Sequence, residues 1–192
     1  MSVTDKVIRE TFIQMLNEEK LSDITVRKIA ERCGISRNAF YYHYANIPEL
    51  LDTIIRDGVD RIIASVPEGA GLEESLTTLY KQALSRKKLL MHVHFSGSRY
   101  ASDEYLRKLC DYIARRFLNT KVFNIPQLAL SDHDKELITS YLFYELVGQC
   151  TVWFNERMPE SFVDEIREMS SLIDTNVRRI VFGFNNRQPD KS

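Results

Sequence analysis

The sequence predicts an all-α protein of about nine helices, and three observations support this fold class. The 192 residues include only 7 glycines and 5 prolines, so the chain has few of the turn signals that a many-stranded fold requires. Apolar residues recur at intervals of three and four over long segments, which is the period of an α-helix. Hydrophobic residues make up 44% of the chain and charged residues 28%, which is typical of a globular protein and not of a disordered one.

The first and the fourth helix of the expected N-terminal domain each follow a start signal. Ser2 and Asp5 have the spacing of a capping box, and the apolar residues after them predict a helix of about four turns. Asn46 can cap a later helix at 47–65, in which Pro48 occupies the first turn, where its missing N–H group costs nothing.

Two shorter helices separated by a sharp turn are expected between these two. Thr25 can cap a helix at 26–33, and Gly34 ends it, because glycine tolerates the positive φ of a helix C-terminus. Ser36 can then cap a third helix. Two short helices joined by a three-residue turn that contains glycine are the components of a helix-turn-helix.

The third helix has two faces of different chemistry. Phe40 and Tyr44 share one face at a spacing of four residues, and we expect both to be buried. The opposite face carries a cation, an amide and phenol hydroxyls, which can reach phosphates and base edges in a major groove. The alternative is an ordinary aromatic patch in a helical core, which the ordered capping, turn and apolar residues around it disfavour. The side chains on the exposed face are Arg37, Asn38, Tyr41, Tyr42 and His43.

Through these residues the chain resembles the DNA-binding domain of the TetR family of bacterial regulators. The resemblance covers residues 4–55 and is carried by the string ITVRKIAERCGISRNAFYYHYANIPELL at 24–51. It implies that Thr25 and Tyr41 bind phosphates and that His43 lies at the rim of the groove. The residues that it assigns to DNA binding are Thr25, Arg27, Ser36, Arg37, Asn38, Tyr41, Tyr42 and His43.

The chain departs from the family pattern at Ile47. Family members usually carry a lysine at this position, where the N-terminus of the fourth helix contacts a phosphate. The N–H groups of that helix could still hold a phosphate, but we expect weaker or less salt-dependent binding, by about 0.9 unit of salt slope for one lost contact. The stretch 25–44 carries four basic residues against one acidic residue, a balance of +3, although the whole chain has a net charge of −1.

The expected domain organisation follows from the turn-rich residues in the middle of the chain. We expect a helix-turn-helix domain at 1–46, a connecting helix at 47–65, a ligand-binding and dimerisation domain at 66–186 and a tail at 187–192. Periodicity predicts helices in the third of these regions near 72–85, 87–96, 102–120, 131–156 and 160–185.

The last two long helices are expected to form a dimer interface. The segment 137–154 is apolar nearly all round, so we expect it to be buried on more than one side, and Gly148 within it permits a close approach of another backbone. The final helix has one apolar stripe between Phe162 and Phe184. In the family these two helices pair with the same helices of a second subunit, which implies a homodimer.

The C-terminal domain also contains candidate effector-binding residues. No motif identifies the ligand, and packing in the core is the alternative role for each candidate. His92 and Tyr112 belong to a wider set of candidates. The main candidates are Met91, Phe95, Tyr105, Tyr141, Tyr144 and Trp153.

The expected function is that of a ligand-responsive homodimeric repressor on a palindromic operator, with two recognition helices roughly 34 Å apart. The alternative is a co-regulator or sensing module that acts through ligand or protein contacts without binding DNA itself. We recognise no catalytic set, phosphate loop or metal-ligand spacing, so no enzyme activity, cofactor or metal is expected. The N-terminus lacks the apolar region of a signal peptide, and no apolar run reaches the roughly 18 residues that span a membrane. We therefore expect a cytoplasmic protein with reduced cysteines.

Overall fold

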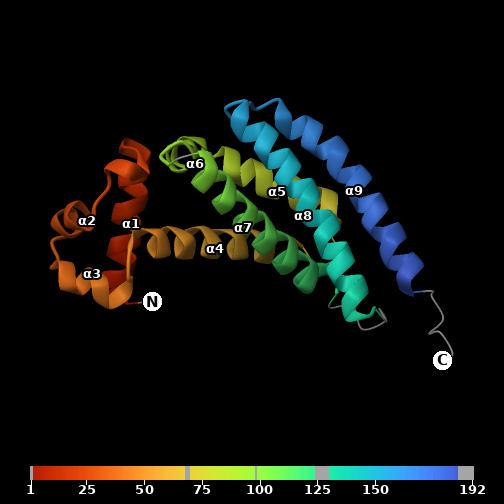
Figure 1. Ribbon diagram of the computed structural model, residues 1–192, viewed down its shortest axis with the longest axis horizontal. Helices are drawn as coiled ribbons and strands as arrows, with labels where there is room; N and C mark the ends of the chain where they lie inside the picture. The colour runs from red at the N-terminus through yellow and green to blue at the C-terminus, as the bar shows by residue number, and fades with distance from the viewer. Residues whose placement is uncertain (1, 68–69, 98, 124–129, 186–192) are drawn as a thin grey trace.

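The computed structural model describes residues 2–67, 70–97, 99–123 and 130–185, and the regular secondary structure in these ranges is helical throughout. This confirms the expected all-α fold. Figure 1 shows two groups of helices that are joined by the long helix α4. In chain order the helices are α1 (Val3–Glu18), η1 (Leu21–Asp23), α2 (Val26–Cys33), α3 (Arg37–His43), α4 (Ile47–Ser65), α5 (Leu72–Leu84), α6 (Lys87–His94), α7 (Arg99–Phe117), η2 (Leu118–Val122), α8 (Asp132–Asn155) and α9 (Phe162–Asn185).

Side-chain caps fix the starts of several helices. The Ser2 hydroxyl accepts a hydrogen bond from the Asp5 N–H at 3.1 Å and so begins α1. Ser131 and Asp134 form a reciprocal capping box at the start of α8. The predicted starts agree with the structure to within a few residues because these caps are local interactions.

Two of the predicted helices end at other residues in the structure. α6 ends at His94, and the Ser96 hydroxyl folds back onto the His92 carbonyl. α7 continues into one wider π-helical turn, η2, in which the Phe123 N–H donates to the Leu118 carbonyl at 2.7 Å. The segment between the helices predicted at 102–120 and 131–156 lies partly outside the described residues, and the tail at 187–192 lies wholly outside them.

Two hydrophobic cores divide the chain, and α4 contributes to both. Leu50 and Leu51 at its start lie in the N-terminal core with the buried residues of α1, α2 and α3, whereas Val59 and Ile63 lie in the C-terminal core. Leu89 of α6 also belongs to the N-terminal core. The two domains are therefore joined through both α4 and α6.

Helices α8 and α9 lie side by side and run in opposite directions at the end of the molecule distant from α3 (Figure 1). As expected, the segment 137–154 is covered on more than one side, because α8 packs against both α7 and α9. One side stays open in the single chain, where Tyr144 is 66% exposed and Val152 is 46% exposed. Gly148 makes no close approach within the chain, since a Cβ atom there would meet no atom within 4 Å. Among the described residues, no helix is both long and apolar enough to cross a membrane.

Candidate nucleic-acid interface

The turn between α2 and α3 is a Schellman motif. Gly34 adopts a left-handed conformation with φ of 67°, and its N–H donates to the Glu31 carbonyl at 3.2 Å. The Ile35 N–H donates to the Ala30 carbonyl at 3.0 Å, which is the second bond of the motif. The turn therefore satisfies two carbonyls at the end of α2 and redirects the chain within two residues.

One face of α3 holds the helix against the N-terminal core. Phe40 is 0% exposed and Tyr44, the residue that ends α3, is 5% exposed. Their rings lie 6.0 Å apart, and Phe40 packs with the buried side chains of α1 and α2. The predicted division of the four aromatic rings is confirmed on this face.

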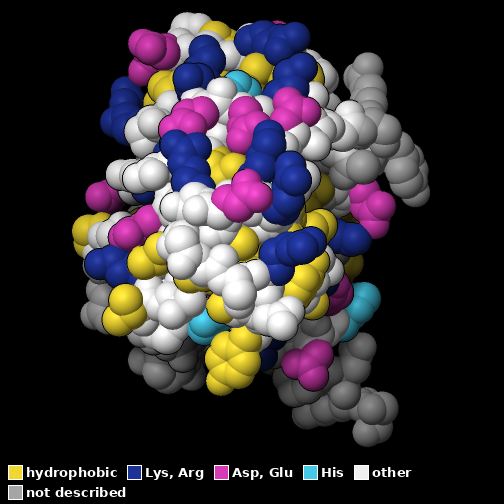
Figure 2. Space-filling view, turned by 90° about the vertical axis from the view of Figure 1, so that its left-hand side faces the viewer, with side chains coloured by type: hydrophobic (Ala, Val, Ile, Leu, Met, Phe, Trp, Pro, Cys, Tyr) yellow, Lys and Arg dark blue, Asp and Glu magenta, His cyan; other side chains and the backbone are white. Residues whose placement is uncertain are grey.

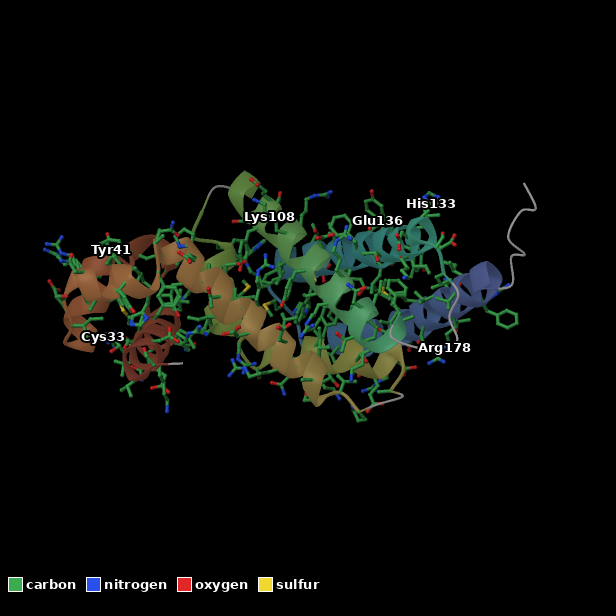
Figure 3. All side chains as sticks on the ribbon, turned by 90° about the horizontal axis from the view of Figure 1, so that it is seen from below. Cys33, Tyr41, Lys108, His133, Glu136 and Arg178 are labelled. Atoms are coloured by element: carbon green, nitrogen blue, oxygen red, sulfur yellow. The ribbon has the colours of Figure 1, made fainter. Side chains whose placement is uncertain are left out.

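The other face of α3 is open to solvent. Tyr42 is 85% exposed and Tyr41 is 54% exposed, while Arg37 and Asn38 are also exposed. His43 is half-buried, with its ring edge-on to Tyr42 at 5.1 Å. Figure 3 shows Tyr41 at the opposite end of the molecule from His133 and Arg178. A set of aromatic, amide and cationic groups thus lies at one end of the protein.

Thr25 and Ser36 act as helix caps. The Thr25 hydroxyl oxygen accepts from the Lys28 N–H at 3.2 Å, and the Ser36 hydroxyl oxygen accepts from the Ala39 N–H at 3.1 Å. Both residues are exposed, and each hydroxyl retains its own hydrogen, which can be donated to a phosphate. Capping and phosphate binding are therefore compatible at both positions.

Two of the four basic side chains at 25–44 are closely paired with acidic side chains of α1 and its C-terminus. Arg32 forms two hydrogen bonds with Glu18 on α1, at 2.6 and 2.7 Å. Lys28 lies 2.8 Å from a carboxylate oxygen of Glu19. Figure 2 accordingly shows basic and acidic side chains interspersed over this end of the molecule.

Of the four basic side chains at 25–44, Arg27 and Arg37 have the weakest interactions with acidic groups. Arg27 lies 3.7 Å from Glu31, and both side chains are more than 60% exposed, so this ion pair is weak. Arg37 has no carboxylate within ion-pair range in the described part of the chain. These two guanidinium groups are available for a phosphate or a guanine edge.

The start of α4 offers few groups to a phosphate. Ile47 is half-buried against the N-terminal core. Pro48 has no N–H, and the Glu49 N–H is occupied by the Asn46 side chain at 2.9 Å. The Glu49 carboxylate also accepts from the Ala45 N–H at 2.7 Å and places a negative charge at this helix end. Few N–H groups of the first turn therefore remain to offset the missing lysine, since Pro48 has none and that of Glu49 is occupied.

A partly buried polar cluster that the sequence did not predict lies behind α3 and supports it. The Arg9 side chain donates to Tyr44 at 2.8 Å and to Asp5 at 3.1 Å, and it also pairs with Asp57 of α4. The Tyr44 hydroxyl donates to Asp5. The only sequence signal was the spacing of four residues between Asp5 and Arg9, which is common on exposed helices.

The environment of this cluster shifts the ionisation of its members. Burial, and then the hydrogen bond to Asp5, raise the pKa of Tyr44 to about 12. Burial acts to raise the pKa of Asp5, but the hydrogen bonds from Tyr44 and Arg9 outweigh it, so the pKa lies below its ordinary value. Asp5 is therefore a carboxylate and Tyr44 a neutral donor at neutral pH.

The six candidate effector residues do not line a common site in the structure. Trp153 is 2% exposed, stacks on Phe162 and donates to the Pro159 carbonyl at 3.2 Å, so it is a core residue. Tyr144 is exposed on α8, and Tyr141 accepts a hydrogen bond from Asn176 of α9.

Of the other three candidates, Tyr105 alone lines a cavity at the junction of the two domains. Met91 is half-buried against the C-terminal core, and Phe95 lies beneath the Arg157 guanidinium at 4.2 Å. In the wider set, His92 bonds to the Leu16 carbonyl. The three cysteines are free thiols, and no group of metal-ligating side chains occurs among the described residues.

Comparison with known proteins finds relatives of the N-terminal helices. Residues 11–54 match the family of bacterial regulatory proteins described as the tetR family. The HTH-type transcriptional regulator YxbF of Bacillus subtilis (strain 168) is 25% identical over 186 residues, which cover 93% of this chain and 46% of YxbF. The class C tetracycline repressor protein of Escherichia coli is 38% identical over 50 residues, which cover 26% of this chain and 22% of that protein. The chain thus spans less than half the length of these curated relatives.

Solved structures share the fold over nearly the whole chain. The dihydroxyacetone kinase operon activator DhaS has a TM-score of 0.58 at 17% identity and covers 95% of this chain and 98% of its own. A TetR regulator from Rhodococcus sp. RHA1 has a TM-score of 0.61 at 15% identity, with 90% and 96% covered. The TetR family repressor AlkX from a Dietzia species has a TM-score of 0.61 at 13% identity, with 91% and 97% covered. Residues 11–54 thus match the helix-turn-helix of the tetR family, and the chain shares its overall fold with solved TetR regulators.

Proposed function

We propose that the protein is a homodimeric, ligand-responsive repressor that binds a palindromic operator through α3. The main support is the division of α3 into two faces. Phe40 is fully buried, whereas 85% of Tyr42 is exposed, although both are large aromatic residues two positions apart. A helix that served only the core would not leave such a ring in water, nor a cation at Arg37 that has no ion-pair partner among the described residues.

The individual DNA contacts follow from the chemistry of the exposed groups. Arg37, Asn38 and Tyr42 are proposed to reach base edges or backbone in the major groove, because guanidinium and amide groups can form paired hydrogen bonds there. Thr25 and Tyr41 are proposed to bind phosphates, which would fix the register of the domain. Arg27, Ser36 and His43 complete the proposed surface at its edge.

The exposed apolar side chains of α8 and α9 support a homodimer. Tyr144 on α8 is 66% exposed and Leu172 on α9 is 67% exposed. Asn176 on α9 donates to the Tyr141 hydroxyl on α8 at 3.2 Å. Leu172 lies one helical turn from Asn176, and Tyr144 lies one turn from Tyr141. The two exposed side chains therefore lie in the same region of the surface. The open space over Gly148 would admit a helix of a second copy closely. Burial of this face in a two-fold dimer would remove apolar surface from water.

A two-fold dimer implies a palindromic site. Two copies of α3 separated by one DNA turn, roughly 34 Å, would enter successive major grooves on one side of the duplex. A ligand that changes this separation would weaken binding, and release from an operator would relieve repression. Two similar proteins are named repressors and one is named an activator, so a reporter gene under the operator must establish the sign. Action on chromosomal DNA also implies a cytoplasmic location.

Selection of random duplexes by the purified protein tests this proposal. The expected result is an enriched palindrome whose half-sites are centred about 10 base pairs apart. A protein with the same fold whose α3 residues Arg37 and Tyr42 are both changed to alanine is the matched control and should enrich no site.

The alternative function, a co-regulator that does not bind DNA itself, is favoured by one observation. Ile47 replaces the phosphate-binding lysine, and Glu49 brings a carboxylate to the same helix end. If the wild-type protein enriches no duplex while remaining folded and dimeric, the alternative replaces the leading proposal.

A further inference from the structure

A cavity of about 380 Å³ lies where the DNA-binding domain meets the C-terminal domain. Its walls come from η1, the first half of α4, α6, α7 and the end of α8. The volume lies within the range of small-molecule sites, about 300–1,000 Å³. Leu21 and Ser22 of η1 and Pro48 at the start of α4 form one side of it, so part of the wall belongs to the DNA-binding domain.

The described wall of the cavity is predominantly apolar. Leucine is its commonest residue, isoleucine, valine, proline and phenylalanine also line it, and no aspartate, glutamate, lysine or arginine occurs among the described lining residues. The ring of His94 stacks on Phe154 at 4.5 Å, and burial lowers its pKa, so it is neutral at physiological pH despite nearby Asp103. A charged ligand would lose its hydration here without gaining a partner.

Tyr105 is one of the lining residues, and its buried hydroxyl has no hydrogen-bond partner among the described residues. Burial raises the pKa of Tyr105, so the group remains a hydrogen-bond donor at all physiological pH values. A buried hydroxyl without an acceptor is unfavourable, and an acceptor atom of a ligand would satisfy it.

Helix α6 connects this cavity to the corner between α1 and η1. The Leu21 N–H donates to the Ser96 hydroxyl oxygen at 2.9 Å, and His92 Nδ1 lies 2.7 Å from the Leu16 carbonyl oxygen. Leu89 of the same helix is buried in the N-terminal core. A molecule in the cavity would therefore contact both α6 and the part of the DNA-binding domain that α6 holds.

We propose that this cavity is the effector site and that it takes a small, uncharged, mainly apolar molecule with an oxygen that accepts a hydrogen bond from Tyr105. The inference rests on the proposed function as a ligand-responsive regulator. The occupant acts directly on the DNA-binding domain, because Leu21, Ser22 and Pro48 form part of its site. A conformational change transmitted through the C-terminal core is not required for this action.

The test uses the full chain without DNA, so its failure is distinguishable from failure to bind an operator. Prodan, a neutral naphthalene ketone whose fluorescence reports polarity, is titrated against the wild type and three variants. Tyr105→Phe removes the donor, Leu109→Trp fills the cavity, and Tyr112→Phe is the matched control. Tyr112 lies on the same helix and donates to Asp60 at 2.7 Å, away from the cavity.

The expected result is one prodan per chain in the wild type and in Tyr112→Phe. Tyr105→Phe should weaken binding about 3- to 10-fold, as the loss of one net hydrogen bond does. Leu109→Trp should abolish saturable binding while circular dichroism remains that of the wild type. Absence of saturable binding to the wild type, or equal affinity in all four proteins, would overturn the assignment of the site.

Hydrogen–deuterium exchange measured with saturating prodan tests the direct contact with the DNA-binding domain. We expect slower exchange of the amides at 19–24 and 90–97, with no change in α9. Protection confined to α7 and α8 would show that the occupant does not act on η1 and would contradict that part of the proposal.

Discussion

Arg9 on α1 and Asp57 on α4 form an ion pair that ties the DNA-binding domain to the connecting helix. The same guanidinium donates to Tyr44, which ends α3. One turn further along α4, Asp60 accepts hydrogen bonds from Tyr112 at 2.7 Å and from Arg116 at 2.9 Å, both on α7. Contacts from the two domains thus converge on one turn of α4, so a movement of α7 can be passed to α3.

Replacement of Arg9 by methionine should destabilise the protein by about 1–3 kcal/mol, because it leaves the mostly buried Asp5 without its charged partner. The matched control is Lys6→Met, which removes an exposed ion pair with Glu10 at 3.8 Å and should change stability by less than about 0.5 kcal/mol. Urea unfolding of the two variants measures the difference. Equal stabilities would show that the cluster does not support α3.

Two glycines should respond to alanine in opposite directions. Gly34→Ala should destabilise the protein by about 1–2 kcal/mol, because φ of 67° is unfavourable for a residue with a Cβ atom. Gly58 lies within α4 with open space around it, so Gly58→Ala should stabilise the protein by about 0.5–1 kcal/mol. Thermal unfolding of both variants compares the signs, and a neutral Gly34→Ala would contradict the described turn.

A lysine at position 47 should strengthen DNA binding and increase its dependence on salt. Ile47→Lys adds a cation at the start of α4, and each new phosphate contact raises the slope of log affinity against log salt by about 0.9. Ile47→Met is the control, since it has a similar length without the charge. Binding measured from low to high salt gives both slopes. An unchanged slope in Ile47→Lys would place this helix end away from the phosphates.

Disruption of the apolar face of α8 and α9 should produce monomers. Leu172→Glu introduces a charge at a side chain that is 67% exposed in the single chain, so folding should be retained. Val3→Glu, at an 83% exposed aliphatic residue on α1, is the control and should leave the assembly unchanged. Sedimentation velocity measures both masses. A dimeric Leu172→Glu protein would require another interface.

The local features of the fold could be predicted from the sequence. Ser2, Thr25, Ser36 and Asn46 act as caps, and Gly34 takes the positive φ, because each of these interactions depends on residues within a few positions. The burial of one face of α3 also followed from its periodicity. Such features are determined by short-range geometry, which a single sequence contains.

The features that depend on contacts between helices could not be predicted in this way. Two of the four basic residues at 25–44, Lys28 and Arg32, are paired by Glu19 and Glu18, which approach only when α1 packs on α2. Tyr105 was a candidate among several aromatic residues, and only the packing of η1 against α6 and α7 places it in a cavity. The sequence shows that the segment 137–154 is apolar, but it does not show which face of this helix a second chain would cover.

The affinity of the protein for its enriched duplex, measured beside its α3 variants, tests the central claim most directly. Arg37→Ala and Tyr42→Ala should each weaken binding at least 10-fold, since about 1–3 kcal/mol is expected for a good contact to a base. Lys81→Ala, an exposed cation on α5, is the control and should bind as the wild type does. Unchanged affinity in both α3 variants, with native circular dichroism, would contradict the assignment of α3 as the recognition helix.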